Sequence, residues 1–225
     1  MDTHISLGPA NSVAIVTLAK GETCIAEGGA MMAMRGQLDV KTTSHTRSGG
    51  GLRKGLKRLL SGESYFTNHF TAQEDKATVI FAPNLPGDMV EIPLSSVGLV
   101  VSSGSYVCCD SSVRMDMSWQ GFKSFLSGEG MFWLKMQGPG KVVLSTFGAI
   151  YTLDVDGEYI VDTGHIVAFE ETLNFNLSKA GNSWLGSFLG GEGFVCRFKG
   201  KGRVWCQSHQ APSFGQELTP SLRKR

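Results

Sequence analysis

The 225-residue chain lacks the motifs that mark most familiar active sites. It contains no G-x-S-x-G nucleophile motif, no Walker A phosphate loop and no Rossmann fingerprint in a strand–helix context. Its five histidines form neither H-x-H nor H-E-x-x-H, so a metal site of the cupin type has no support. We therefore expect a protein that is not an enzyme, with no catalytic residue, no cofactor and no metal.

The sequence also lacks membrane and secretion signals. No run of 18 apolar residues occurs, which excludes a transmembrane helix. Residues 1–10 have neither the basic and apolar regions of a secretory signal nor the arginines of a transit peptide. The cysteine count is odd and no C-x-x-C pair exists, so zinc binding is disfavoured. We expect a cytoplasmic, soluble protein whose cysteines are small buried hydrophobes in a reducing compartment.

A short sequence motif occurs three times in the chain. Similarity at a fixed period indicates a fold built from one repeated unit. Apolar residues before each glycine recur at i, i+3 and i+4, which predicts a short helix that ends at the glycine. The three copies of the motif are Leu59-Leu60-Ser61-Gly62-Glu63, Phe125-Leu126-Ser127-Gly128-Glu129 and Phe188-Leu189-Gly190-Gly191-Glu192.

Strand-like sequence surrounds each helix. Two apolar runs precede it and a hairpin follows it, and the 29 glycines suit many tight turns. In the third copy we expect the hairpin turn at residues 199–202. The sequence therefore predicts an all-β fold: a single compact domain over residues 1–215, in which three β-sandwich units with short helices surround a pseudo-threefold axis. The units cover about 12–95, 96–150 and 151–210, and a basic tail covers 211–225.

The repeated Gly-Glu pairs have two interpretations. A motif present once per structural unit usually serves the unit, so the favoured one is a structural corner in which glutamate caps backbone N–H groups near a turn. The alternative places three symmetry-related carboxylates around the axis to bind a cation or a partner. The residues are Gly62 with Glu63, Gly128 with Glu129, and Gly191 with Glu192.

Charge is distributed unevenly although the formal net charge is only +1. Residues 41–60 hold six basic side chains and no acidic one, and we expect residues 41–55 to form a mobile, Gly/Ser/Thr-rich basic link. This segment is either a solvated helix face or a basic patch that contacts anionic lipid, nucleic acid or an acidic partner. The candidate contact residues are Arg47, Arg53, Lys54, Lys57 and Arg58.

The basic link running into the strand at residues 63–70, the loop at residues 82–87 and the Gly128-Glu129-Gly130 turn resemble one family over residues 15–208. It is the mitochondrial-biogenesis family named for altered inheritance of mitochondria, which has many prokaryotic members. The resemblance implies a β-rich fold similar to the tryptophan RNA-binding attenuation protein, a double-stranded β-helix type of sandwich. It implies no catalytic activity and no ligand residues, and fold similarity alone does not transfer tryptophan or RNA binding.

Three functions remain after these exclusions. The favoured one is a non-catalytic structural, assembly or interaction module that binds an unidentified protein partner or itself, with an anionic membrane surface as a further contact. The second is a small-molecule-binding protein or an undetected enzyme. Nucleic-acid binding through the basic link is the least favoured, and it would show strong salt dependence.

Overall fold

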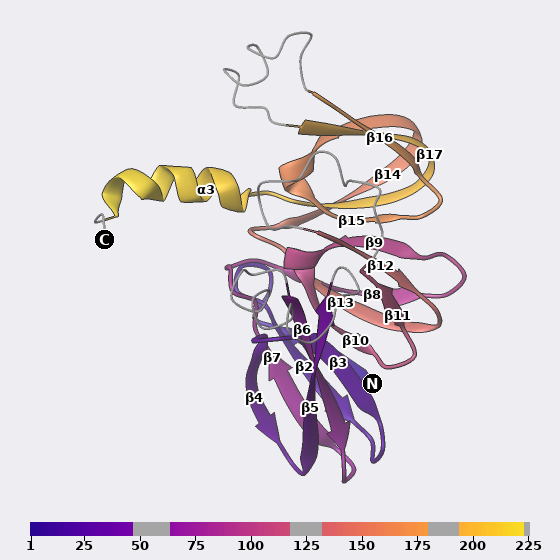
Figure 1. Cartoon of the computed structure of the whole chain (residues 1–225), viewed down its shortest axis with the longest axis vertical. Coiled ribbons are helices and arrows are strands. Elements are labelled where there is room, and N and C mark those ends of the chain that lie inside the picture. Colours follow the sequence, from indigo (N-terminus) through magenta and orange to yellow (C-terminus); the bar gives the residue numbers. More distant parts are fainter. Residues whose placement is uncertain (47–63, 118–131, 180–193, 223–225) are drawn as a thin grey trace.

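The structure is a computed structural model that describes residues 1–46, 64–117, 132–179 and 194–222. It is built almost entirely of antiparallel β-strands, so the all-β expectation is confirmed (Figure 1). The strands are β1 Asp2–Ser6, β2 Val13–Leu18, β3 Thr23–Glu27, β4 Met31–Arg35, β5 Leu38–Thr46, β6 Ser64–Ala72, β7 Ala77–Phe81, β8 Met89–Leu94, β9 Leu99–Ser102, β10 Tyr106–Asp110, β11 Arg114–Asp116, β12 Trp133–Gln137, β13 Gly140–Ser145, β14 Ile150–Asp162, β15 Ile166–Glu170, β16 Asn174–Lys179 and β17 Phe194–Gln207.

These strands form sheets that follow one another along the long axis of the molecule (Figure 1). The first sheet has the order β1-β2-β7-β4, and the second has the order β5-β6-β3-β10-β13-β8. The third has the order β11-β12-β9-β15-β17-β14, with β16 paired to β17. The second and third sheets are each composed of two parts that come from different stretches of the chain.

The same kind of strand pairing joins the two parts of each composite sheet. In the second sheet β10 lies antiparallel to β3, with Cys109 opposite Ile25. In the third sheet β15 lies antiparallel to β9, with Phe169 opposite Val100. We call these pairings the first joint (β3·β10) and the second joint (β9·β15). The two joints have the same orientation and cover three residue pairs each.

A register shift recurs at the start of β4, β10 and β15. Each of these strands pairs with a later strand (β7, β13 and β17), and in each case one residue is skipped after the first pair. The skipped residues are Met32, Val107 and Val167. A bulge of this kind bends the strand and increases its twist.

The hairpin turn expected at residues 199–202 is wrong. β17 runs through these residues without a break and pairs with β14 along its whole length, with Gly200 opposite Gly157. Both glycines have a positive φ, of 117° and 111° respectively, which side chains with a Cβ rarely adopt. The glycines therefore bend a long two-stranded ribbon and do not end it.

Apolar side chains fill the spaces between successive sheets. One cluster lies between the first and second sheets and includes Phe70 and Phe81, whose rings meet edge to face at 5.6 Å. The next cluster, between the second and third sheets, includes Tyr106 and Leu134. The last cluster surrounds Phe169 on the far side of the third sheet. Alternate residues of each strand enter these layers, as the two-residue period of a strand requires.

Two further segments have regular structure that the sequence analysis did not predict. Residues 41–46 of the expected mobile link belong to β5, because they continue its pairing with β6 as far as Thr46 opposite Ser64. The expected basic tail contains a helix, α3 (Ala211–Leu218), followed by a short 3₁₀ turn, Thr219–Ser221. Figure 1 shows α3 projecting from the side of the body. The ring of Phe214 packs edge to face against Phe147, with the two centroids 5.2 Å apart, and this contact ties α3 to the body.

In the part of the chain that the structure describes, no helix has the length and apolar character needed to cross a membrane. The cytoplasmic location stays a prediction.

Candidate functional site

The site residues predicted from the sequence all lie outside the described residues. This holds for the basic residues Arg47, Arg53, Lys54, Lys57 and Arg58. It holds equally for the repeated pairs Gly62 and Glu63, Gly128 and Glu129, and Gly191 and Glu192. Both interpretations of the Gly-Glu pairs therefore stay predictions.

The outer side of β4, which we call the β4 edge, is an exposed apolar strand edge. Within the described residues β4 pairs with β7 on one side only. The corresponding strands β10 and β15 are covered by the two joints, and their side chains Cys109 and Phe169 are 0% and 1% exposed. On β4, the side chains of Met31, Met32 and Met34 are 41%, 56% and 51% exposed. β4 thus resembles one half of a joint that has no second half.

Residues 158–162 of β14 form the opposite half, which we call the β14 edge. They pair with β17 just as β3 pairs with β6 and β9 with β12, but no described strand covers their other side. Tyr159 and Ile160 are 43% and 53% exposed, whereas Leu99 and Val100 at the same places in β9 are 1% and 2% exposed. The two exposed edges therefore lie on strands that match the two sides of a joint.

Two backbone hydrogen bonds show which groups point across a joint. Ser111 donates its N–H to the Thr23 carbonyl at 3.3 Å, and Glu171 donates its N–H to the Gly98 carbonyl at 3.0 Å. Backbone groups alternate sides along a strand, so Ile25 and Val100, two residues further on, also direct their N–H and C=O groups into the joints. By the same alternation the N–H and C=O groups of Ile160 point out of the β14 edge.

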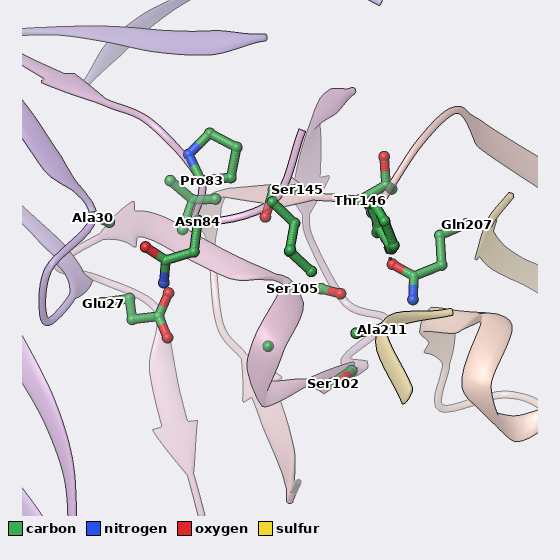
Figure 2. A pocket seen from close by; sticks show the side chains of 14 residues that line it. Glu27, Ala30, Pro83, Asn84, Ser102, Ser105, Ser145, Thr146, Gln207 and Ala211 are labelled. Atoms are coloured by element: carbon green, nitrogen blue, oxygen red, sulfur yellow. Dashed lines mark hydrogen bonds between the residues drawn. The ribbon is translucent and has the colours of Figure 1, made fainter. Parts of the chain in front are cut away.

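A separate feature is a cavity of about 230 Å³, where the ends of strands from all three sheets meet the start of α3. Figure 2 shows Glu27 and Asn84 on one side of it and Thr146 and Gln207 on the other, with Ser105 between them. Apolar side chains such as Ala30, Leu85, Val107 and Phe147 complete the lining. The cavity combines apolar walls with several convergent polar groups, which is the usual character of a small-molecule site.

Among the described residues that line the cavity, Glu27 alone is charged. Burial raises the pKa of its carboxyl group to about 7, because no ionic partner compensates the loss of solvent around the charge. Tyr65 lies nearby. Burial, followed by the charge of Glu27, raises the pKa of its hydroxyl group, and that hydroxyl has no hydrogen-bond partner within the described residues. The carboxyl group of Glu27 can therefore change its charge near neutral pH.

All five cysteines are free and buried, which confirms that they behave as small core residues. Burial raises the pKa of the Cys196 thiol to about 12 and that of the Cys206 thiol to about 11, so neither is an activated nucleophile. Among the described residues, no group of three or more His, Cys, Asp and Glu side chains could hold a metal ion.

Sequence reasoning missed both the exposed edges and the cavity. The three copies of the edge position, Ile25, Val100 and Ile160, are all aliphatic, so nothing in the residue types separates an internal position from an exposed one. Glu27 is a single carboxylate at the end of an apolar strand, and no spacing rule marks it. The signal that could have found the edges is the repeat itself, since a linear row of units has two ends.

Comparisons with known proteins agree with this fold. The chain is 27% identical over 210 residues to an uncharacterized protein of Streptococcus pyogenes serotype M6, and the match covers 88% of this chain and 84% of that protein. A crystal structure of a Streptococcus pyogenes protein from the Northeast Structural Genomics Consortium aligns with a TM-score of 0.77 at 24% identity, covering 98% of this chain and 99% of that one. This second likeness shows the fold alone. The family model described as mitochondrial biogenesis AIM24 matches residues 4–209, and the chain therefore belongs to the AIM24 family.

Proposed function

We propose that this protein is a non-catalytic assembly module whose copies join head to tail, with the β4 edge of one chain paired to the β14 edge of the next. One observation carries the proposal. The chain uses the same antiparallel pairing twice internally, and at its two ends it presents one uncovered half of that pairing each. Exposed strand edges readily pair with another chain unless they are protected. The partner is thus a second copy of this chain.

The internal joints define the register of the proposed contact. Cys109 faces Ile25 and Phe169 faces Val100, so Met34 would face Ile160 of the next copy. Arg35 would then face Tyr159 and lie one residue from Glu158. The new contact would bury the half-exposed side chains of Met31, Met32, Met34, Tyr159 and Ile160. It would also extend the strands β2-β7-β4 of the first sheet into a composite sheet, like the second and third sheets.

The proposal treats the chain as three copies of one unit, as the sequence predicts. The recurring register shift at Met32, Val107 and Val167 supports this reading. Closure of the units around a pseudo-threefold axis within one chain stays a prediction, because β4 and β14 do not pair with each other in the described part of the chain. The similarity to the tryptophan RNA-binding attenuation protein likewise stays a prediction.

A pair of variants that each block one edge tests the proposal. Met34→Lys places a charge on the β4 edge, and Ile160→Lys places one on the β14 edge, at positions that are already half exposed in the single chain. A head-to-tail contact uses two different surfaces, so each variant keeps one functional edge. Sedimentation of each variant alone and of an equimolar mixture measures the result.

We expect the average mass of the wild-type protein to rise with concentration, and each variant alone to remain monomeric. The mixture should form a dimer and stop there, because the two remaining edges are complementary and the other two are blocked. A wild-type protein that stays monomeric at every concentration contradicts the proposal. A mixture without dimers does so as well.

A further inference from the structure

The cavity beside Glu27 contains polar groups that the fold itself does not use. Two lining residues are fully engaged: Thr146 donates its hydroxyl to the Gly148 carbonyl, and Gln207 accepts from the Phe147 N–H and donates to the Gly164 carbonyl. Four others make no side-chain hydrogen bond within the described part of the chain, and they come from four separate segments. They are Glu27 at the end of β3, Asn84 in the β7–β8 loop, Ser105 in the 3₁₀ turn Ser103–Ser105, and Ser145 at the end of β13.

Ser105 and Ser145 place hydroxyl groups in the lining of the cavity. Ser105 is 5% exposed and Ser145 is 7% exposed, yet both line the cavity. Neither hydroxyl group is among the buried side-chain atoms that lack a partner in the described part of the chain, so both are reachable from the cavity. A ligand in the cavity would accept or donate hydrogen bonds at both hydroxyl groups.

The charge of the lining selects the kind of ligand. Glu27 is partly buried, and among the described residues it has no cationic partner and no lysine, arginine or histidine lines the cavity. A partly desolvated carboxylate favours a positively charged group beside it. Ala30, Val107 and Phe147, which are all buried, supply apolar surface to the lining. The arrangement suits a molecule with an ammonium group at one end and an apolar body at the other.

We propose that this cavity binds a small organic cation, whose ammonium group pairs with Glu27 and Asn84 and whose apolar body lies against Ala30 and Phe147. The cavity volume of about 230 Å³ is about eight times the roughly 30 Å³ that one water molecule occupies in the liquid. This limits the ligand to a compact amine. The site lies within one chain, so it does not depend on head-to-tail assembly.

Amide NMR spectroscopy of the full chain with n-butylammonium as the probe tests this proposal, and 1-butanol serves as the uncharged probe of the same shape. At pH 8 we expect saturable shifts of the Ser105 and Ser145 amide signals with n-butylammonium, and at least about tenfold weaker binding of 1-butanol. The affinity for n-butylammonium should fall about tenfold between pH 8 and pH 6, because Glu27, with a pKa of about 7, loses most of its charge over this range. Tyr65 is the other titratable group that interacts with Glu27, and burial keeps it neutral at both pH values.

Two variants separate a specific site from a general charge effect. Glu27→Gln should abolish both the preference for the cation and the pH dependence. Asp154→Asn removes an equal charge from an exposed position on β14 and should change neither. Absence of saturable shifts with n-butylammonium at pH 8 overturns the proposal. Equal binding of n-butylammonium by wild-type protein and Glu27→Gln overturns it too.

Discussion

Proline substitutions at three matched positions offer a direct test of the idea that Ile160 lies in an uncovered joint. Ile25, Val100 and Ile160 occupy the same place in β3, β9 and β14, since each lies opposite the matching residue of β6, β12 or β17. At all three the backbone N–H points away from that partner strand. Proline removes this N–H and is tolerated in a strand only where the N–H faces solvent.

The expected costs follow from what each N–H contacts. At Ile25 and Val100 the N–H lies in a joint, so its loss leaves a buried carbonyl without a donor. We expect this to lower the free energy of unfolding by about 1–3 kcal/mol, and poorer packing to lower it by about 1 kcal/mol more. At Ile160 the N–H faces water in the single chain, so we expect a cost within about 1 kcal/mol. The same substitution should weaken association about tenfold or more, because the lost hydrogen bond lies in the contact between chains.

Urea denaturation of dilute protein measures the first effect, and sedimentation of concentrated protein measures the second. The expected pattern is strong destabilisation in Ile25→Pro and Val100→Pro, and near-normal stability with lost association in Ile160→Pro. If Ile160→Pro is as unstable as Val100→Pro, the β14 edge is covered within the chain and the reasoning is refuted. If Ile160→Pro associates like the wild-type protein, the edge is not the contact.

Three further predictions concern the first joint, the cavity and the basic link. Tyr106 donates its hydroxyl to the Ile25 carbonyl at 2.7 Å across the first joint, so Tyr106→Phe should lower the free energy of unfolding by about 1 kcal/mol in urea titrations, and an unchanged midpoint would count against a role for this bond. Burial raises the pKa of Glu27 from 4.5 to about 7. Between these pH values the folded state holds a proton that the unfolded state has lost. The free energy of unfolding should therefore fall by up to about 3 kcal/mol as the pH rises from 4.5 to about 7. Glu27→Gln should remove this fall, and an identical pH profile would show that the carboxyl group is not desolvated. A variant with Arg53, Lys54, Lys57 and Arg58 changed to glutamine tests whether the basic link contacts anionic membranes. If it does, the variant should no longer float with anionic vesicles, and equal flotation of the variant and the wild-type protein would exclude that contact.

Much of the strand content could be predicted from local sequence, because buried strands carry strong apolar patterns. Residues 77–81 alternate in burial and form β7, and residues 141–145 form most of β13. The missed strands are β1, β3, β8, β5, β11 and β16, and of these β5, β11 and β16 are polar and largely exposed. The strands β5, β11 and β16 are held in place by pairing with β6, β12 and β17. They have no apolar pattern of their own that would predict them.

The turn expected at residues 199–202 failed for a related reason. A Lys-Gly-Lys-Gly sequence is typical of a hairpin turn. Here Gly200 meets Gly157 across the ribbon, and the two glycines together allow both strands to bend while their pairing continues. Only the partner strand distinguishes a bend from a turn, and the local sequence does not contain it.

The candidate sites could not be predicted from the sequence. The cavity gathers Glu27, Asn84, Ser105 and Ser145 from four segments, and no motif spacing links them. The exposed edges depend on the number of units and on which strands are left uncovered. Aliphatic residues at Val100 and Ile160 look alike in the sequence, and they differ only in what covers them.

Disulfide trapping across the proposed contact tests the central claim most directly. Met34→Cys and Ile160→Cys in one chain would place two thiols opposite each other, at the Cα separation of about 5.5 Å that disulfides tolerate. The five native cysteines are buried and do not compete. Our account predicts a ladder of dimers and larger species under oxidising, non-reducing conditions, absent from each single variant. A disulfide formed within single chains, or none at all, would contradict head-to-tail assembly.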